Sequence, residues 1–161
     1  VMIPSIYEYF ANGVIADGSA GMRLALWHAA TLIFIDNPLF GTGPSSYLVE
    51  IAAYVDLGLI SEQARSFSHP HNQFFNGLVE SGIFGPLMVY SIYGSFIWYC
   101  RSHLLHNKAL ATAGILMAIG FIDFGMVEVI WDINNAGVFY TVMMVLIAGK
   151  LSHDQATANT P

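Results

Sequence analysis

Two kinds of hydrophobic pattern divide the chain near residue 82. Before it, apolar positions alternate with Gly, Pro, Ser and charged residues, whereas long apolar runs follow it, separated by short polar turns. The run from Gly82 to Cys100 has 19 residues without a charge, close to the roughly 20 that a helix needs to cross a bilayer. Two more such runs follow. We therefore expect three C-terminal transmembrane helices, at about residues 82–100, 109–127 and 133–149.

The first half of the chain predicts shorter helices. Residues 22–36 form an apolar stretch that is too short to span a bilayer, so we expect an interfacial or partly re-entrant helix. Asn37-Pro38 ends it, because the residue before a proline is forced out of the helical region. A second helix is expected at about 46–57, with a serine of the Pro44-Ser45-Ser46 sequence as its N-cap.

The remaining segments complete an all-helical prediction. Residues 58–70 have the Gly, Ser and Pro content of a loop, and residues 71–81 have apolar positions at helical spacing. The small, polar tail at 151–161 is expected to be disordered and cytoplasmic. The pattern predicts an all-α integral membrane protein. An extracytoplasmic or interfacial region at 1–81 precedes three spans within 82–150, all part of one larger domain.

Composition supports the membrane class. Of 161 residues, 55% are hydrophobic and 10% charged, and the mean hydropathy is +0.57; a soluble domain has about 25% charged residues. The net charge of −6, with five scattered basic residues, excludes a nucleic-acid partner. The single cysteine, Cys100, excludes an internal disulfide framework. Because no basic stretch precedes an apolar one at the start, we expect no signal peptide and interpret the chain as a C-terminal fragment of a longer polytopic protein.

Basic residues near the spans predict an orientation. Arg101 and Lys108 lie between the first and second spans, and Lys150 follows the third, whereas the turn at 128–135 has no basic residue. Basic residues concentrate on the cytoplasmic side of membrane proteins. Residues 1–81 are therefore expected on the outer face, which is the periplasm if the membrane is a bacterial inner membrane.

A cluster of polar side chains lies just before the first span, within Ser68–Gly85. His71 is a candidate general base, because histidine alone has an unperturbed pKa near neutral pH; the alternative is an N-cap or loop histidine bonded to the backbone. His69 is expected to position other groups or to be structural. Asn72 could orient His71, bind a hydroxyl group or be solvated. Glu80 lies two and a half turns after His71 and is expected to cap a helix or pair with an arginine.

Two arginines, Arg23 and Arg65, lie on the same predicted side. In a site for an anionic lipid diphosphate, guanidinium groups would bind the phosphate oxygens; the alternative is that they reach out to lipid headgroups. A functional role is favoured for Arg23, which shares a helix face with Trp27. Gly41 and Gly43 predict a tight turn, but they lack the third glycine and the preceding strand of a dinucleotide-binding loop.

Asp123 and Glu128 mark the outer end of the second span. Asp123 lies about 7–8 Å below Glu128 along a helix, and ionisable groups at such a depth face a cavity or a partner. A transporter in which these two residues relay an ion is therefore one alternative, and a non-catalytic partner in envelope assembly is another. The sequence has no CxxC or His/Cys metal spacing, so we expect no metal and no cofactor.

Several of these residues together resemble a known family. His71-Asn72, followed after nine residues by Gly82-x-x-Gly85, is similar to the signature of bacterial O-antigen ligases and their relatives, the O-antigen polymerases and O-linked protein oligosaccharyltransferases. Glu128 fits the same family. An earlier block is also similar to it and consists of Arg23-x-x-x-Trp27, Asn37-Pro38-Leu39-Phe40-Gly41-x-Gly43 and Tyr47.

The resemblance implies a fold and an activity. The fold would be a GT-C-type helical bundle in the bacterial inner membrane, multi-pass and with its active site facing the periplasm. The donor would be a glycan on undecaprenyl diphosphate and the acceptor a hydroxyl of lipid A-core, among membrane lipids. His71 would deprotonate the acceptor and Arg23 would bind the diphosphate, in an inverting, metal-independent reaction.

The remaining site predictions combine the chemistry of the residues with this resemblance. Because the family's N-terminal spans and their arginines are missing, this part alone is expected to be inactive. The outer loop is also compact, so the choice between ligase and polymerase activity stays open. The candidate substrate-binding residues are Arg23, Arg65, Asn72, His69 and Glu128. The structural motif comprises Gly41, Gly43, Glu80, Gly82 and Gly85.

Overall fold

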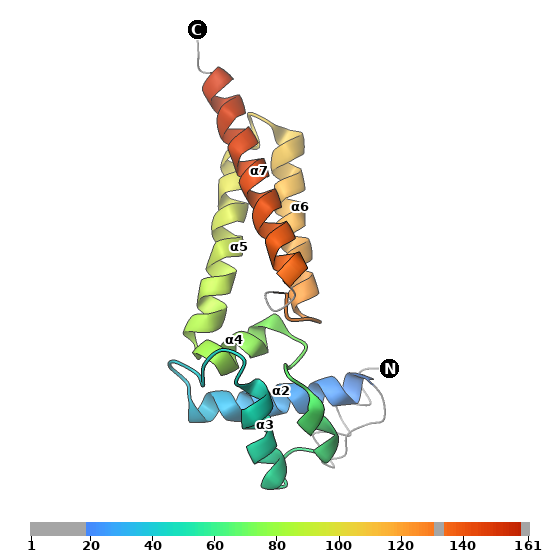
Figure 1. The fold of residues 1–161 in the computed structure, drawn as a ribbon. Helices are drawn as coiled ribbons and strands as arrows, with labels where there is room; N and C mark the ends of the chain where they lie inside the picture. Colours follow the sequence, from blue (N-terminus) through green and yellow to red (C-terminus); the bar gives the residue numbers. More distant parts are fainter. Residues whose placement is uncertain (1–18, 131–133, 159–161) are drawn as a thin grey trace. The chain divides into compact units, whose positions relative to one another are not determined.

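A computed structural model describes residues 19–130 and 134–158 and shows a helical protein (Figure 1). Within those two ranges every regular element is a helix and no strand is present, which confirms the all-α prediction. The chain divides into two compact units, Val1–Leu87 and Met88–Pro161, each with its own hydrophobic cluster. The GT-C arrangement stays a prediction.

Between residues 19 and 83, the first unit contains four helices. The helices expected over 22–36 and 46–57 are both present, and residues 58–70, expected as a loop, include a short 3-10 helix whose N-cap is Ser61. The longest of the four, α2, contacts the other three. The elements are α2 (Ser19–Asp36), α3 (Tyr47–Asp56), η1 (Glu62–Ser66) and α4 (Gln73–Ser81).

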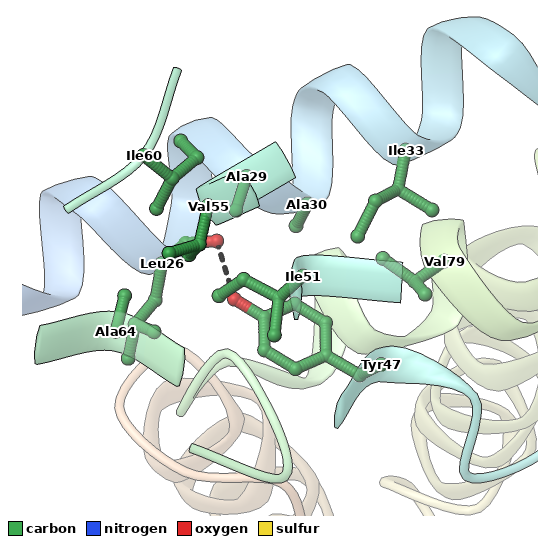
Figure 2. Packing of buried hydrophobic residues seen from close by; sticks show 10 residues of the cluster. All are labelled: Leu26, Ala29, Ala30, Ile33, Tyr47, Ile51, Val55, Ile60, Ala64 and Val79. Carbon is green, nitrogen blue, oxygen red and sulfur yellow. Dashed lines mark hydrogen bonds between the residues drawn. The ribbon is translucent and has the colours of Figure 1, made fainter. Parts of the chain in front are cut away.

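The core of the first unit forms between α2 and α3 (Figure 2). Leu26, Ala29, Ala30 and Ile33 of α2 are fully buried, and their spacing is that of an amphipathic helix. The two alanines leave room for the side chains of α3. The buried Tyr47 hydroxyl donates a 2.8 Å hydrogen bond to the Leu26 carbonyl, and burial raises the pKa of Tyr47 well above its usual value. This bond fixes the start of α3 against α2.

The start of α3 differs in one detail from the prediction. Ser46 is at the N-cap position, but its side chain makes no capping hydrogen bond to the helix. Its backbone is already helical, with φ −78° and ψ −17°, whereas a capping residue is normally extended. Its hydroxyl donates instead to the Gly43 carbonyl at 2.6 Å and lies 2.5 Å from the Thr42 hydroxyl. Ser46 therefore stabilises the preceding turn.

In the described part of the second unit, residues 88–130 and 134–158, most of α5 is followed by two further helices. The helices are α5 (Phe84–Ser102), α6 (Lys108–Gly125) and α7 (Asn134–Ala158). Helices α6 and α7 pack together, and a cluster that includes Phe96, Cys100 and Ile147 lies between the helices of this unit. Gly114 permits this packing, because a Cβ atom there would lie 2.6 Å from the Cys100 sulfur.

Two helices in the described part of the chain are long and apolar enough to cross a membrane. They are Lys108–Gly125 and Asn135–Ala158, which correspond to the second and third predicted spans. Helix α5 has a span's length, 19 residues, but its tyrosines, tryptophan and serines reduce its hydropathy. The span predicted at 82–100 therefore stays a prediction, as does membrane crossing itself.

The expectation of a disordered tail from residue 151 is wrong, because α7 continues to Ala158. Asp154 explains the extra turns: its carboxylate accepts a 2.6 Å bond from Lys150, one turn earlier, and a 2.8 Å bond from the Asn107 side-chain amide. Asn107 also caps α6 through its carbonyl oxygen. The polar tail is thus held as a helix against the start of α6.

Candidate functional site

His71 lies in the loop immediately before α4, in a conformation that is uncommon for a residue with a side chain. Its φ is 48°, in the left-handed region that costs L-residues about 1–2 kcal/mol. Its backbone N–H donates to Nδ1 of His69 at 3.2 Å. The centroids of the two imidazole rings lie 4.2 Å apart with their planes at 68°, and the Phe67 ring lies edge-to-face with His71, with centroids 5.7 Å apart. The His71 ring is half-buried within this group of rings.

The predicted helix at 71–81 begins two residues later than expected, at Gln73. Asn72, rather than His71, is the N-cap: its Oδ1 accepts the N–H groups of Phe74 at 2.9 Å and Phe75 at 3.2 Å. Asn72 is 1% exposed, so it is not the solvated loop residue that was one expectation. These bonds give Asn72 a structural task, and its contact with a substrate stays a prediction.

Trp27 connects α2 to the loop that carries His71. The indole Nε1 donates a 2.9 Å hydrogen bond to the carbonyl of Pro70. The indole ring also stacks on Phe75 of α4, with ring centroids 5.5 Å apart and planes at 17°. The sequence motif includes Trp27, but the hydrogen bond to Pro70 and the stacking on Phe75 were not predicted from it. Its only signal was the four-residue spacing from Arg23.

Arg23 and Arg65 have different surroundings. Arg65 binds Asp56 at 2.5 Å and Glu62 at 2.6 Å, and these hydrogen bonds raise the pKa of its guanidinium. Arg23 is half-buried one helical turn before Trp27. Across residues 19–130 and 134–158, no carboxylate forms an ion pair with Arg23. Among the described residues, Arg65 is therefore ion-paired and Arg23 is not; the binding of a ligand by Arg23 stays a prediction.

The turn after α2 and the end of α4 pack backbone against backbone. Thr42 N–H donates to the Val79 carbonyl at 2.8 Å, and Gly43 N–H donates to the Glu80 carbonyl at 3.0 Å. In return, Ile83 N–H donates to the Pro38 carbonyl at 2.9 Å. These bonds satisfy carbonyl groups that a helix end otherwise leaves free. We call this arrangement of residues 37–43 against 79–85 the glycine junction.

Glycine is required at two positions of the glycine junction. Gly41 and Gly82 have φ of 66° and 59°. A Cβ atom at Gly41 would lie 2.5 Å from the Glu80 carbonyl carbon, and one at Gly82 would lie 2.6 Å from the Pro38 oxygen. Both positions therefore combine a left-handed backbone with a lack of space. This is the physical reason for two of the motif glycines.

Gly85, the last motif glycine, serves a different contact. It lies in the first turn of α5 against Gly77 of α4, where a Cβ atom would approach the Gly77 Cα within 2.8 Å. A Cβ atom at Gly77 would in turn lie 3.1 Å from the Pro86 nitrogen. Sequence reasoning missed Gly77, whose only signal was a glycine inside a helical pattern. The pair allows α4 and the start of α5 to approach closely.

The Glu80 side chain makes a further hydrogen bond close to the glycine junction. Its Oε1 accepts the N–H of Ser45 at 2.7 Å, just before the first residues of α3. Ser45 precedes the N-cap residue Ser46, so this bond supports the turn before α3, and the expected capping or arginine pairing of Glu80 stays a prediction. Gly43 has φ of 102°, and a Cβ atom there would have no neighbour within 4 Å, so only its backbone conformation requires glycine.

The two acidic candidates lie in the second unit. Glu128 follows the end of α6, where its N–H donates to the Phe124 carbonyl and its carboxylate accepts the N–H of Val129 at 3.1 Å. Asp123, on the last turn of α6, is exposed within that unit. Their proposed contacts with a substrate or an ion stay predictions.

Comparison with known proteins adds two findings. A family model described as O-antigen ligase matches residues 1–90, which include both glycine-containing motifs and His71. An uncharacterised protein of Haemophilus influenzae is 24% identical over 131 residues, covering 79% of this chain and 33% of the relative. The chain therefore spans about a third of the length of the curated relative that it matches.

Proposed function

This chain belongs to the O-antigen ligase family, and on that premise we propose that it is part of a membrane glycosyltransferase of the ligase type. The donor is a glycan on undecaprenyl diphosphate, and the acceptor is a sugar hydroxyl of lipid A-core. The active site faces the periplasm. Polymerisation of the glycan on its lipid carrier, or transfer to a protein hydroxyl, are the alternatives within the family.

We propose that His71 is the general base. Its imidazole takes the proton of the acceptor hydroxyl as the hydroxyl oxygen attacks the anomeric carbon of the donor sugar. The bond from that carbon to the diphosphate breaks, the anomeric configuration inverts, and undecaprenyl diphosphate leaves with the electron pair. A loop position, half-buried and beside a helix start, suits a base that must reach a bulky acceptor.

We propose that Arg23 binds the diphosphate. A guanidinium group matches two phosphate oxygens at once, and Arg23 has no carboxylate partner within the described residues. Arg65, which was the other candidate, is already bound by Asp56 and Glu62. A diphosphate would have to displace those two carboxylates, so the arrangement favours Arg23.

One observation carries the proposal: the hydrogen bond from Trp27 to the Pro70 carbonyl. Arg23 and Trp27 share one face of α2, and Pro70 is adjacent to His71. The bond therefore brings the earlier motif beside the His-Asn motif within the first unit. A base and a phosphate-binding cation on neighbouring segments are what transfer from a sugar diphosphate requires.

The test measures transfer by the full-length protein in proteoliposomes, with undecaprenyl-diphosphate-linked glycan and lipid A-core. His71→Ala is expected to lower kcat by about a hundredfold or more. Arg23→Ala is expected to raise the KM for the donor strongly, and Arg23→Lys to restore little of it, because an ammonium cannot bind two oxygens in the same geometry. EDTA is expected to leave transfer unchanged.

Matched controls separate function from general damage. Arg65→Ala and His106→Ala replace the same residue types at an ion-paired and an exposed position, and both are expected to retain transfer. Undiminished transfer by His71→Ala would exclude its role as base. The size of the product decides between ligation to lipid A-core and polymerisation on the lipid carrier.

A further inference from the structure

We propose that His69 is a positioning residue for His71. This inference rests on the proposed function of His71 as the base. Nδ1 of His69 accepts the His71 backbone N–H at 3.2 Å and holds residue 71 in its left-handed conformation. The direction in which the His71 imidazole points then depends on a bond made by its neighbour two residues earlier.

The backbone conformation at His71 requires such a support. With φ of 48°, residue 71 lies in a region that residues other than glycine rarely occupy unless a local contact holds them there. Side chains that bond to the N–H two residues later close a small ring and stabilise a turn, as Asn and Asp commonly do. His69 makes the same kind of ring through Nδ1.

The residue between the two histidines makes the turn stiff. Pro70 has a fixed φ and restricts His69 to an extended backbone, and its side chain is fully buried. Trp27 holds the Pro70 carbonyl from the side of α2 at 2.9 Å. Residues 69–71 are thus held by Trp27 from one side and by His69 from within, which leaves little freedom at His71.

The bond also defines the state of the His69 ring. A nitrogen that accepts an N–H carries no proton, so the neutral ring must have its proton on Nε2. His69 can support His71 through Nδ1 without itself taking a proton from the substrate. An acceptor of similar reach, such as the side-chain oxygen of asparagine, should serve equally well, whereas a proton relay could not be replaced in this way.

The test compares two substitutions of His69 in the full-length protein under the same transfer assay. His69→Leu removes the acceptor and is expected to lower kcat about tenfold, with both KM values unchanged. His69→Asn restores an acceptor for the His71 N–H and is expected to recover at least half of the wild-type kcat. Trp27→Phe, which keeps the ring stack but loses the bond to Pro70, is expected to lower kcat in the same way.

Controls make the outcomes distinct. Ser68→Ala changes the adjacent exposed residue and is expected to have no effect, and thermal melting shows whether each variant folds. If His69→Asn is as slow as His69→Leu while both fold, the positioning role is overturned, because the imidazole ring and not only its acceptor atom is then required. A wild-type kcat for His69→Leu overturns it as well. If His71→Ala is fully active, the proposed function has failed, a result distinct from either outcome at His69.

Discussion

At the scale of single residues, the adjacent His71 and Asn72 have separate tasks. His71 lies outside the helix with its ring among other rings, whereas the Asn72 side chain is buried and begins α4. The sequence pattern His-Asn therefore combines a candidate chemical group with the cap that fixes where the next helix starts. A change at Asn72 should therefore lower the stability of the first unit through the loss of this cap.

Asn72→Ala is expected to destabilise the first unit by about 1–2 kcal/mol, because the N–H groups of Phe74 and Phe75 lose their acceptor. Asn72→Ser keeps an acceptor of the type preferred at an N-cap and should lose much less. Thermal melting of the purified protein in detergent compares the two. Equal melting temperatures for both variants would contradict the capping role.

At the scale of elements, the glycine junction joins segments that are far apart in sequence. The turn after α2 supplies donors for the last carbonyls of α4, and the residue after Gly82 returns a bond to Pro38. The contact consists mainly of backbone groups, and the Thr42 hydroxyl adds a bond to the Val79 carbonyl at 3.2 Å. Residues 37–43 and residues 79–85 therefore form one structural contact, although they belong to two separate sequence motifs.

Two glycines of α5 offer a matched experiment. Gly85→Ala is expected to destabilise the protein by about 1–3 kcal/mol, because its Cβ would meet the backbone of Gly77. Gly94→Ala lies in the same helix with no atom within 4 Å and should be neutral, or stabilising by up to about 1 kcal/mol. Melting temperatures of the two variants give the comparison. A neutral Gly85→Ala would show that α4 and the start of α5 are not so closely packed.

The same scale shows what the sequence could predict. Helical spacing and Pro38 located α2 and α3 because these signals are local. The pattern could not show that Gly77 faces Gly85, or that Trp27 reaches Pro70, because both depend on how helices meet. The prediction for the polar tail was wrong for a similar reason: Asn107, whose bond to Asp154 supports it, lies 47 residues earlier.

At the scale of the whole molecule, the family and the two apolar helices support a membrane protein, and the basic residues predict its orientation. The proposed transfer on the periplasmic side requires the same orientation. Residues of the first unit should then be accessible from outside, whereas the connection between α5 and α6 should face the cytoplasm.

Cysteine labelling in spheroplasts checks this orientation. Gln63→Cys, at an exposed position of η1, is expected to react with a membrane-impermeant maleimide. Leu105→Cys, where the native residue is 99% exposed, is expected to react only after permeabilisation. The wild-type protein, whose Cys100 is buried, provides the background. Labelling of Leu105→Cys in intact spheroplasts would show that the orientation is the reverse of the predicted one.

The two parts of the glycine junction are synthesised at different times. Thr42 and its acceptor Val79 are separated by 37 residues, so the donor emerges from the ribosome well before its partner. At about 5–20 residues per second, synthesis delays the partner by roughly 2 to 7 s. During that interval the turn after α2 must rely on water or on a chaperone for its hydrogen bonds.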